Sequence, residues 1–134
     1  MYIRLDEVAT LALLGYIDLK TYTIPNVILL GWMITIISLK IGTTSISHLH
    51  IGLSVIIVGA YIPLKHIAKC QGGDVKLYAL LALTHTADDA MVIILISMLL
   101  SLIPMALGVK NIPLAFTTFL GYITFLFLRM EGMV

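Results

Sequence analysis

Two aspartates stand beside turn-forming residues in a chain that is otherwise almost entirely apolar. Asp18 is followed, after a short polar stretch, by Pro25 and Asn26, and Asp74 follows the pair Gly72 and Gly73. A carboxylate inside a bilayer is costly, by about 2.5 to 3.5 kcal/mol at a helix centre, so acids in such segments often mark functional sites. We therefore interpret the two aspartates as parts of one shared site.

The two carboxylates could act as a catalytic pair. Two carboxylates held close together do not both ionise readily, so one keeps a proton while the other stays charged, and the pair titrates as a unit. The charged group can take a proton from water, and the protonated group can polarise a peptide carbonyl and assist the leaving amine. This chemistry needs no metal, and we expect no cofactor. The glycines beside Asp74 leave room for an extended substrate backbone.

Each of these residues also has a structural interpretation. An aspartate near a helix end commonly serves as a cap, and this holds for Asp18 and Asp74 taken singly. Lys76 is typical of a lysine that anchors a helix at the membrane interface, and its alternative role is to orient Asp74 or the substrate. Asp88 and Asp89 are expected to cap the helix that follows them, since acids suit a helix start.

The composition is that of an integral membrane protein. Of the 134 residues, 60% are hydrophobic and 11% are charged, and the mean hydropathy is +1.10. A soluble domain carries about 25% charged residues, so this chain cannot cover itself with a water-facing surface. The formal net charge of +1 gives no indication of nucleic-acid binding. The single Cys70 excludes an internal disulfide and a multi-cysteine zinc site.

The apolar stretches predict an all-α polytopic protein with about six transmembrane helices, at about 20 residues per span. We expect one transmembrane domain over residues 1–134, with a retained first helix rather than a cleaved signal peptide. A turn is expected at Gly72–Asp74, because paired glycines favour turns. The predicted segments are Leu5–Asp18, Pro25–Leu39, Ile46–His66, Val75–Thr86, Ala90–Leu107 and Ile112–Leu128.

The basic residues of the loops indicate the orientation of these helices. Loops rich in lysine and arginine face the cytoplasm, and the bias here places both termini outside it. It also places Asp18 and Asp74 on one face, the cytoplasmic one, because two helices separate them. The more basic side holds Lys20, Lys65, Lys69, Lys76 and Lys110, and the other side holds Arg4, Lys40 and Arg129.

Two motifs resemble those of the type IV prepilin peptidases and the related archaeal preflagellin peptidases, which are membrane aspartic proteases. The family's first motif is an aspartate at the end of helix one, then a short polar stretch and Ile-Pro-Asn, and residues 18–26 match it with the full spacing. Its second motif is Gly-x-Gly-Asp-x-Lys-Leu, and residues 71–77 match it except that Gln71 replaces the first glycine. Pro113, with small and aromatic neighbours, resembles a third and weaker motif.

This resemblance implies a function and a substrate class. Asp18 and Asp74 would be the catalytic pair, at the cytoplasmic face of a multi-pass protein of the cell membrane. The substrates would be prepilin-like precursors, which lose a short basic leader after a glycine and before a hydrophobic helix. The larger bacterial members carry an extra segment with paired cysteines and methylate the new N-terminus, so cleavage without methylation is expected here. Supporting or substrate-binding roles would fall to Lys20, Pro25, Asn26, Gly72, Gly73 and Lys76.

Three other interpretations stay open. An intramembrane protease of the presenilin and signal-peptide-peptidase type shares the glycine–aspartate signature, but has more spans and a Tyr-Asp motif in place of the first motif seen here. A small proton or cation transporter subunit would place its acids near mid-membrane, whereas Asp18 and Asp74 fall at helix ends. A relative that binds precursors without cutting them would not need both acids.

Overall fold

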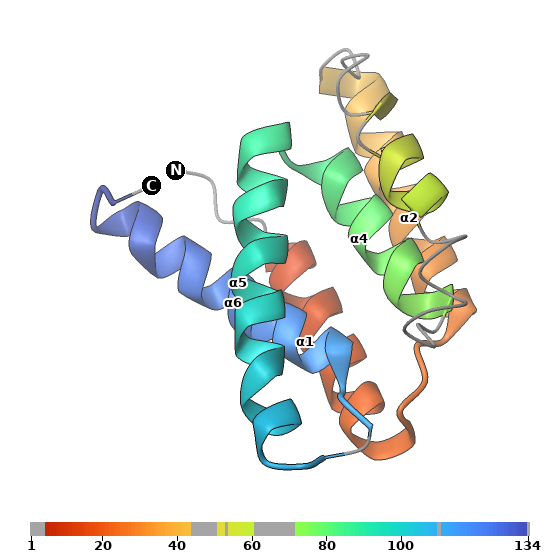
Figure 1. Ribbon diagram of the computed structural model, residues 1–134. Coiled ribbons are helices and arrows are strands. Elements are labelled where there is room, and N and C mark those ends of the chain that lie inside the picture. Colours follow the sequence, from red (N-terminus) through yellow and green to blue (C-terminus); the bar gives the residue numbers. More distant parts are fainter. Residues whose placement is uncertain (1–4, 44–50, 53, 61–71, 110, 134) are drawn as a thin grey trace. The chain divides into compact units, whose positions relative to one another are not determined.

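The computed structural model describes residues 5–43, 51–52, 54–60, 72–109 and 111–133. Every regular element in these ranges is an α-helix, which confirms the all-α prediction. The chain divides into two compact units (Figure 1). The first unit comprises Met1–Ile24 and Val92–Val134, and the second comprises Pro25–Met91. Each unit has its own set of packed helices.

In the first unit, α1 (Leu5–Thr21) lies against α6 (Leu114–Met130) (Figure 1). The buried residues of α1 recur at helical spacing and form one stripe along the helix. This stripe carries a carboxylate near each end, and the two are about three turns apart. The sequence of α1 thus turns two acids toward the interior of the unit. The stripe consists of Glu7, Leu11, Leu14, Gly15 and Asp18.

Glu7 is part of a buried polar contact between α1 and α6. Its side chain is fully buried, and its Oε2 accepts a hydrogen bond of 2.9 Å from the hydroxyl group of Tyr122. Taking one partner out of a buried hydrogen bond costs about 1–3 kcal/mol, so the pair favours one register of α1 on α6. This role of Glu7 was not predicted, because an acid in the first turn of a helix is ordinary.

Two glycines allow close helix contacts in the first unit. A Cβ added to Gly15 would lie 3.2 Å from the Cα of Phe116, where α1 meets the start of α6. A Cβ added to Gly121 would overlap the Oγ of Ser97 and lie 3.0 Å from its backbone nitrogen. Small residues let helix backbones approach closely in membrane proteins. Gly121 therefore sets the distance between α6 and α5 (Ala87–Ala106) at Ser97.

Replacing Gly121 by alanine is expected to destabilise the protein by about 1–3 kcal/mol, because the added methyl group overpacks the contact with Ser97. Adding Ser97→Ala should restore part of the loss by removing the overlapping hydroxyl, while the tight backbone contacts stay. Thermal unfolding of the detergent-purified variants measures both effects. Gly31→Ala is the matched control, because a Cβ at Gly31 would have no neighbour within 4 Å. Equal stability of the Gly121 and Gly31 variants would contradict the close contact.

In the second unit, α2 (Asn26–Thr43) packs against α4 (Gly72–Thr84). Residues 54–60 are helical, and the hydroxyl of Ser54 donates a hydrogen bond of 3.1 Å to the carbonyl oxygen of Ala79. This contact attaches the 54–60 helix to the middle of α4. The buried apolar residues of α2 and α4 include Leu29, Trp32, Ile36, Leu77, Leu80 and Leu81.

Two predicted features at helix starts are wrong. Gly72–Asp74 form the first turn of α4 and not a turn before it, because glycine is permitted in a helix and an acid suits its first turn. The acids at the start of α5 do not supply its cap. The Oγ1 of Thr86 accepts the backbone N–H of Asp89 at 3.3 Å, so Thr86 takes this role. Asp88 and Asp89 lie in the first turn of α5.

Among the described helices, α5 alone is long and apolar enough to cross a membrane. The 18-residue α2 and the 17-residue α6 contain shorter apolar stretches, and α4 has 13 residues. The predicted third segment, Ile46–His66, lies partly outside the described residues. Residues 65–69, which include Lys65 and Lys69, and Gln71 lie wholly outside them. The side chains that α5 exposes are mostly large and apolar, as a lipid-facing helix requires. They include Met91, Leu95, Met98, Leu99, Leu102, Ile103 and Met105.

Candidate functional site

Asp18 is a buried acid at the N-terminus of a neighbouring helix. Its side chain is only 3% exposed, and its Oδ2 accepts the backbone N–H of Ala115 at 2.8 Å. The backbone N–H of Phe116 also donates to this carboxylate. Pro113, the N-cap residue of α6, makes no capping hydrogen bond with its own side chain. Asp18 therefore takes the place of the missing cap and satisfies backbone donors that have no partner within the helix.

The local structure of α1 explains how Asp18 reaches α6. Gly15, one turn earlier on the same stripe, lets the backbone of α1 approach Phe116. The helix ends soon after the acid, at Thr21, and the next residue, Tyr22, has a left-handed φ of 52°. The N–H of Tyr22 donates to the carbonyl oxygen of Asp18 at 2.8 Å, a common way to end a helix. Asp18 is thus fixed both by its side chain and by the end of its own helix.

Lys20 lies on the other side of α1 from Asp18. Its Nζ is 4.6 Å from the centroid of the Tyr16 ring, and both residues are exposed. A cation over an aromatic ring at an exposed position contributes about 0.5–1 kcal/mol. The structure therefore places Lys20 on the exposed surface of α1, whereas Asp18 belongs to the buried stripe.

Asp74 is a partly buried acid in the first turn of α4, two residues after the helix begins at Gly72. The unpaired N–H groups of a first turn give it a partial positive charge, which stabilises a carboxylate there. Both aspartates thus lie at a helix N-terminus: Asp74 at that of its own helix, and Asp18 at that of α6. Asp18 belongs to the first unit and Asp74 to the second.

A hydrogen bond joins the two sequence motifs inside the second unit. The Nζ of Lys76 donates to the Oδ1 of Asn26 at 2.8 Å, across 50 residues of sequence. Asn26 is the first residue of α2, and the carbonyl oxygen of Pro25 accepts the N–H of Leu29 at 3.3 Å in the first turn. The Pro-Asn pair therefore sets the start of α2 where it meets the lysine that follows Asp74. The sequence predicted these residues as supporting ones but did not predict their contact.

The contact between Lys76 and Asn26 should appear as a coupling energy in a double-mutant cycle. Lys76→Met and Asn26→Ala are each expected to destabilise the protein by about 0.5–1.5 kcal/mol, because each removes the same hydrogen bond. The double variant should cost less than the sum of the two single variants, as partners in direct contact do. Thermal unfolding of the four proteins gives the coupling. Additive losses would show that the two side chains do not interact.

The two N–H groups that bind Asp18, and the glycine that lets α1 approach them, were not found from the sequence. The N–H groups of Ala115 and Phe116 bind its carboxylate, and Gly15 allows the close approach. Backbone donors leave no side-chain signature, so the sequence indicated this segment only as the third and weaker motif at Pro113, without any contact to Asp18. In the part of the chain that the structure describes, no group of three or more His, Cys, Asp or Glu side chains could hold a metal ion.

Comparison with known protein families identifies the family of this chain. The model of a family described as the type IV leader peptidase family matches residues 8–106. The matched region is more than half of the chain and includes both aspartate motifs, and it ends before α6. No curated protein and no solved structure matches the chain significantly.

Proposed function

Because the chain belongs to the type IV leader peptidase family, we propose that it is a membrane aspartic endopeptidase that removes the leader from type IV prepilin-like or preflagellin-like precursors. The observation that carries this proposal is the family match over residues 8–106, which includes Asp18 and Asp74 in their motifs. Membership itself makes the protein a peptidase of the leader-peptidase kind. The aspartic mechanism, the substrate and the cellular location are parts of the proposal.

In the proposed mechanism, Asp18 and Asp74 act as a pair. The ionised carboxylate takes a proton from water while the water oxygen attacks the carbonyl carbon of the scissile peptide bond. The protonated partner donates its proton to the leaving nitrogen as the carbon–nitrogen bond breaks, which leaves a new carboxyl group and a new amine. The hydrogen bonds from α6 support this role, because they hold the Asp18 carboxylate in one orientation.

The remaining sequence motifs supply the supporting residues of the proposed site. The bond between Lys76 and Asn26 supports an orienting role for both, since it ties the first turn of α4 to the start of α2. The absence of bulky side chains before Asp74 supports approach of a substrate backbone. Cleavage is proposed to occur without methylation of the new N-terminus. The proposed supporting residues are Lys20, Pro25, Asn26, Gly72, Gly73 and Lys76.

The proposed location is the cell membrane, crossed by about six helices of a single domain, with the acids at the cytoplasmic face. The 60% hydrophobic composition and the apolar surface of α5 support a place in the bilayer. The bias of the loop lysines supports the orientation. Lipid and precursor proteins are the proposed partners, and nucleic acid is not among them.

The test of the function is leader release from purified, detergent-solubilised protein. A panel of precursors with basic leaders is incubated with the protein, and the products are identified by mass spectrometry. The expected result is cleavage at one fixed bond that is lost in variants of Asp18 and Asp74 and kept in Asp88→Asn. This result would establish that the protein is an aspartic peptidase. Asp88 is the matched control, because it is an exposed aspartate in the first turn of α5. Folded protein that cuts no precursor would contradict the proposal. A proton-flux assay would then test the alternative interpretation, that the protein is a proton or cation transporter subunit.

A further inference from the structure

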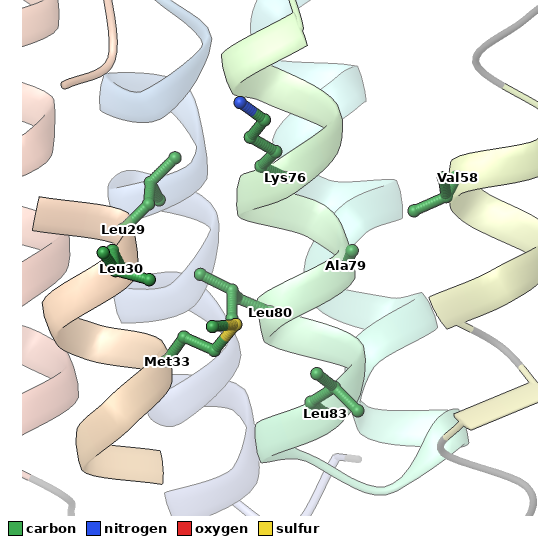
Figure 2. Close-up of a pocket in the computed structure, with 8 residues that line it drawn as sticks. All are labelled: Leu29, Leu30, Met33, Val58, Lys76, Ala79, Leu80 and Leu83. Atoms are coloured by element: carbon green, nitrogen blue, oxygen red, sulfur yellow. The ribbon is translucent and has the colours of Figure 1, made fainter. Parts of the chain in front are cut away.

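An apolar groove with a lysine at one end lies along α4 in the second unit. Its volume is about 260 Å³, and its described lining comes from α2, α4 and the helical residues 54–60. Figure 2 shows Lys76 at one end of the groove and Leu83 at the other, with Met33 on α2 and Val58 on the 54–60 helix. The groove is lined by Leu29, Leu30, Met33, Val58, Lys76, Ala79, Leu80 and Leu83.

Two helices build this groove with the same residue spacing. On each helix, a polar residue is followed by three apolar lining residues at intervals of three, four and seven, which place them on one face. The polar residues are Lys76 on α4 and Asn26 on α2, and the Nζ of Lys76 donates to the Oδ1 of Asn26 at 2.8 Å. The groove therefore has one polar end and an apolar body. The apolar residues of the body are Ala79, Leu80 and Leu83 on α4 and Leu29, Leu30 and Met33 on α2.

The groove has a buried floor and exposed walls. Leu29 and Leu80 are 3% and 6% exposed and form the floor, whereas Leu30 and Val58 are 53% and 51% exposed and form the walls. Large apolar side chains that stay half exposed around a hollow have surface left to bury against a ligand. The groove is therefore open, so a ligand can enter from the side.

The polar end of the groove carries a positive charge. Lys76 is exposed and is the only charged residue among the described lining residues. Its ammonium group has three donor hydrogens, and the one printed acceptor, Asn26, is neutral. Asp74, two residues earlier on α4, lies about 200° away around the helix axis and so on the opposite side from Lys76. The polar end of the groove therefore attracts an anionic group.

The apolar body favours a hydrocarbon chain over a peptide. From residue 76 to residue 83 the helix rises by about 10 Å, which is less than one leaflet of a hydrocarbon core about 30 Å thick. An extended peptide along this length would bring N–H and C=O groups that gain no hydrogen bond from the described apolar lining. A helix satisfies its own backbone, but 10 Å of a helix about 10 Å wide fills roughly three times the volume of the groove.

We propose that this groove binds one anionic phospholipid, with the phosphate group at Lys76 and Asn26 and an acyl chain along the apolar body. The inference goes beyond the proposed peptidase activity and rests only on the proposed place in the membrane. Three features select this occupant over a segment of the precursor: the cation at one end, the lack of hydrogen-bonding partners along the described body, and a volume too small for a helix.

The direct test is native mass spectrometry of the detergent-purified protein, titrated with phosphatidylglycerol or phosphatidylcholine. The first lipid should bind about fivefold more tightly as phosphatidylglycerol, because one lysine near an anionic headgroup contributes about this factor. This preference should disappear in Lys76→Met and persist in Lys76→Arg. Lys20→Met is the matched control, because Lys20 is an exposed lysine of α1 that does not line the groove, and it should keep the preference.

Several outcomes of this titration would overturn the proposal. Equal affinity of the unchanged protein for the two lipids would do so, and so would equal loss of preference in the two methionine variants. An excess of glycerol 3-phosphate, a headgroup without acyl chains, should leave the lipid bound, and displacement would show a site for phosphate alone. Displacement of the lipid by a precursor would show that the groove belongs to the substrate.

A second variant tests the apolar body and leaves the hydrogen bond between Lys76 and Asn26 in place. Leu30→Trp should weaken binding of the first phosphatidylglycerol about tenfold, because the indole ring would displace about two methylene groups of the acyl chain. Ile37→Trp is the control, because Ile37 is also exposed on α2 but does not line the groove, and it should bind the lipid as the unchanged protein does. Equal affinities of the two tryptophan variants would overturn the proposal.

The lipid site and the proposed peptidase fail in different ways. If leaders are released but the first lipid shows no dependence on Lys76 or on position 30, the lipid site is wrong and the peptidase stands. If one phosphatidylglycerol binds as expected but folded protein cuts no precursor, the proposed peptidase activity is wrong and the lipid site stands.

Discussion

Asp18→Asn is expected to abolish leader release and to leave the fold intact. The amide cannot exchange a proton with water or substrate, so kcat/KM should fall by about 10³-fold or more, as when one member of a catalytic unit is removed. In the unchanged protein the N–H of Ala115 donates to the Asp18 carboxylate at 2.8 Å, and the amide oxygen of the variant can still accept this hydrogen bond. The thermal unfolding transition should therefore stay close to that of the unchanged protein.

Asp18→Ala separates the two roles of this residue. Alanine removes the acid and also the cap of α6, whose own N-cap residue Pro113 makes no capping hydrogen bond. Loss of a capping side chain costs about 0.5–2 kcal/mol, so this variant should be inactive and less stable than Asp18→Asn. Leader release by mass spectrometry and thermal unfolding, run on both variants, measure the two effects.

Each outcome for Asp18 has a definite meaning. A folded and fully active Asp18→Asn would show that Asp18 serves as a helix cap alone, and the catalytic pair would be wrong. Equal stability of the asparagine and alanine variants would show that the bond to Ala115 contributes nothing to the fold. Inactivity of both, with a stability difference between them, is the result that the structure leads us to expect.

Much of the helical pattern could be predicted from the sequence, because apolar runs and helix-breaking residues have local effects. The predicted first segment, Leu5–Asp18, differs from α1 only by the last turn. The predicted start of the second segment at Pro25 is one residue from the start of α2 at Asn26. Proline suits such a position because it lacks an N–H group that the first turn does not need.

The errors arose where the same residue types suit two structures. Paired glycines favour a turn, yet Gly72 and Gly73 begin α4, because glycine is also permitted in the first turn of a helix. The acids before the fifth segment suit both a cap and a first turn, and Thr86 decides between them by accepting the N–H of Asp89. In both places a hydrogen bond or a helix boundary, not the composition, distinguishes the alternatives.

Contacts between distant residues could not be predicted from one sequence. The partners of Asp18 are backbone N–H groups about 100 residues away, and any residue type except proline could supply them. Lys76 was predicted either to anchor α4 at the membrane interface or to orient Asp74 or the substrate, but its hydrogen bond to Asn26 was not predicted. That bond gives a physical reason for the two motifs to occur together: each positions a residue of the other.

Asp74→Asn is expected to abolish leader release, again by about 10³-fold or more in kcat/KM. The matched variant is Asp88→Asn, because both residues are aspartates in the first turn of a helix. Each substitution removes a favourable interaction with a helix N-terminus, worth about 0.3–1 kcal/mol, so the two variants should lose similar stability. The pair of variants therefore separates catalysis from helix electrostatics.

Leader release and thermal unfolding of these two variants decide the role of Asp74. Similar small losses of stability, with activity lost only in Asp74→Asn, would identify the carboxylate as part of the reaction. Equal activity of the two variants would show that Asp74 only stabilises the first turn of α4 and takes no part in the reaction. Membership of a peptidase family does not depend on this residue's role, so the family assignment would stand while the proposed pair of catalytic aspartates would be wrong.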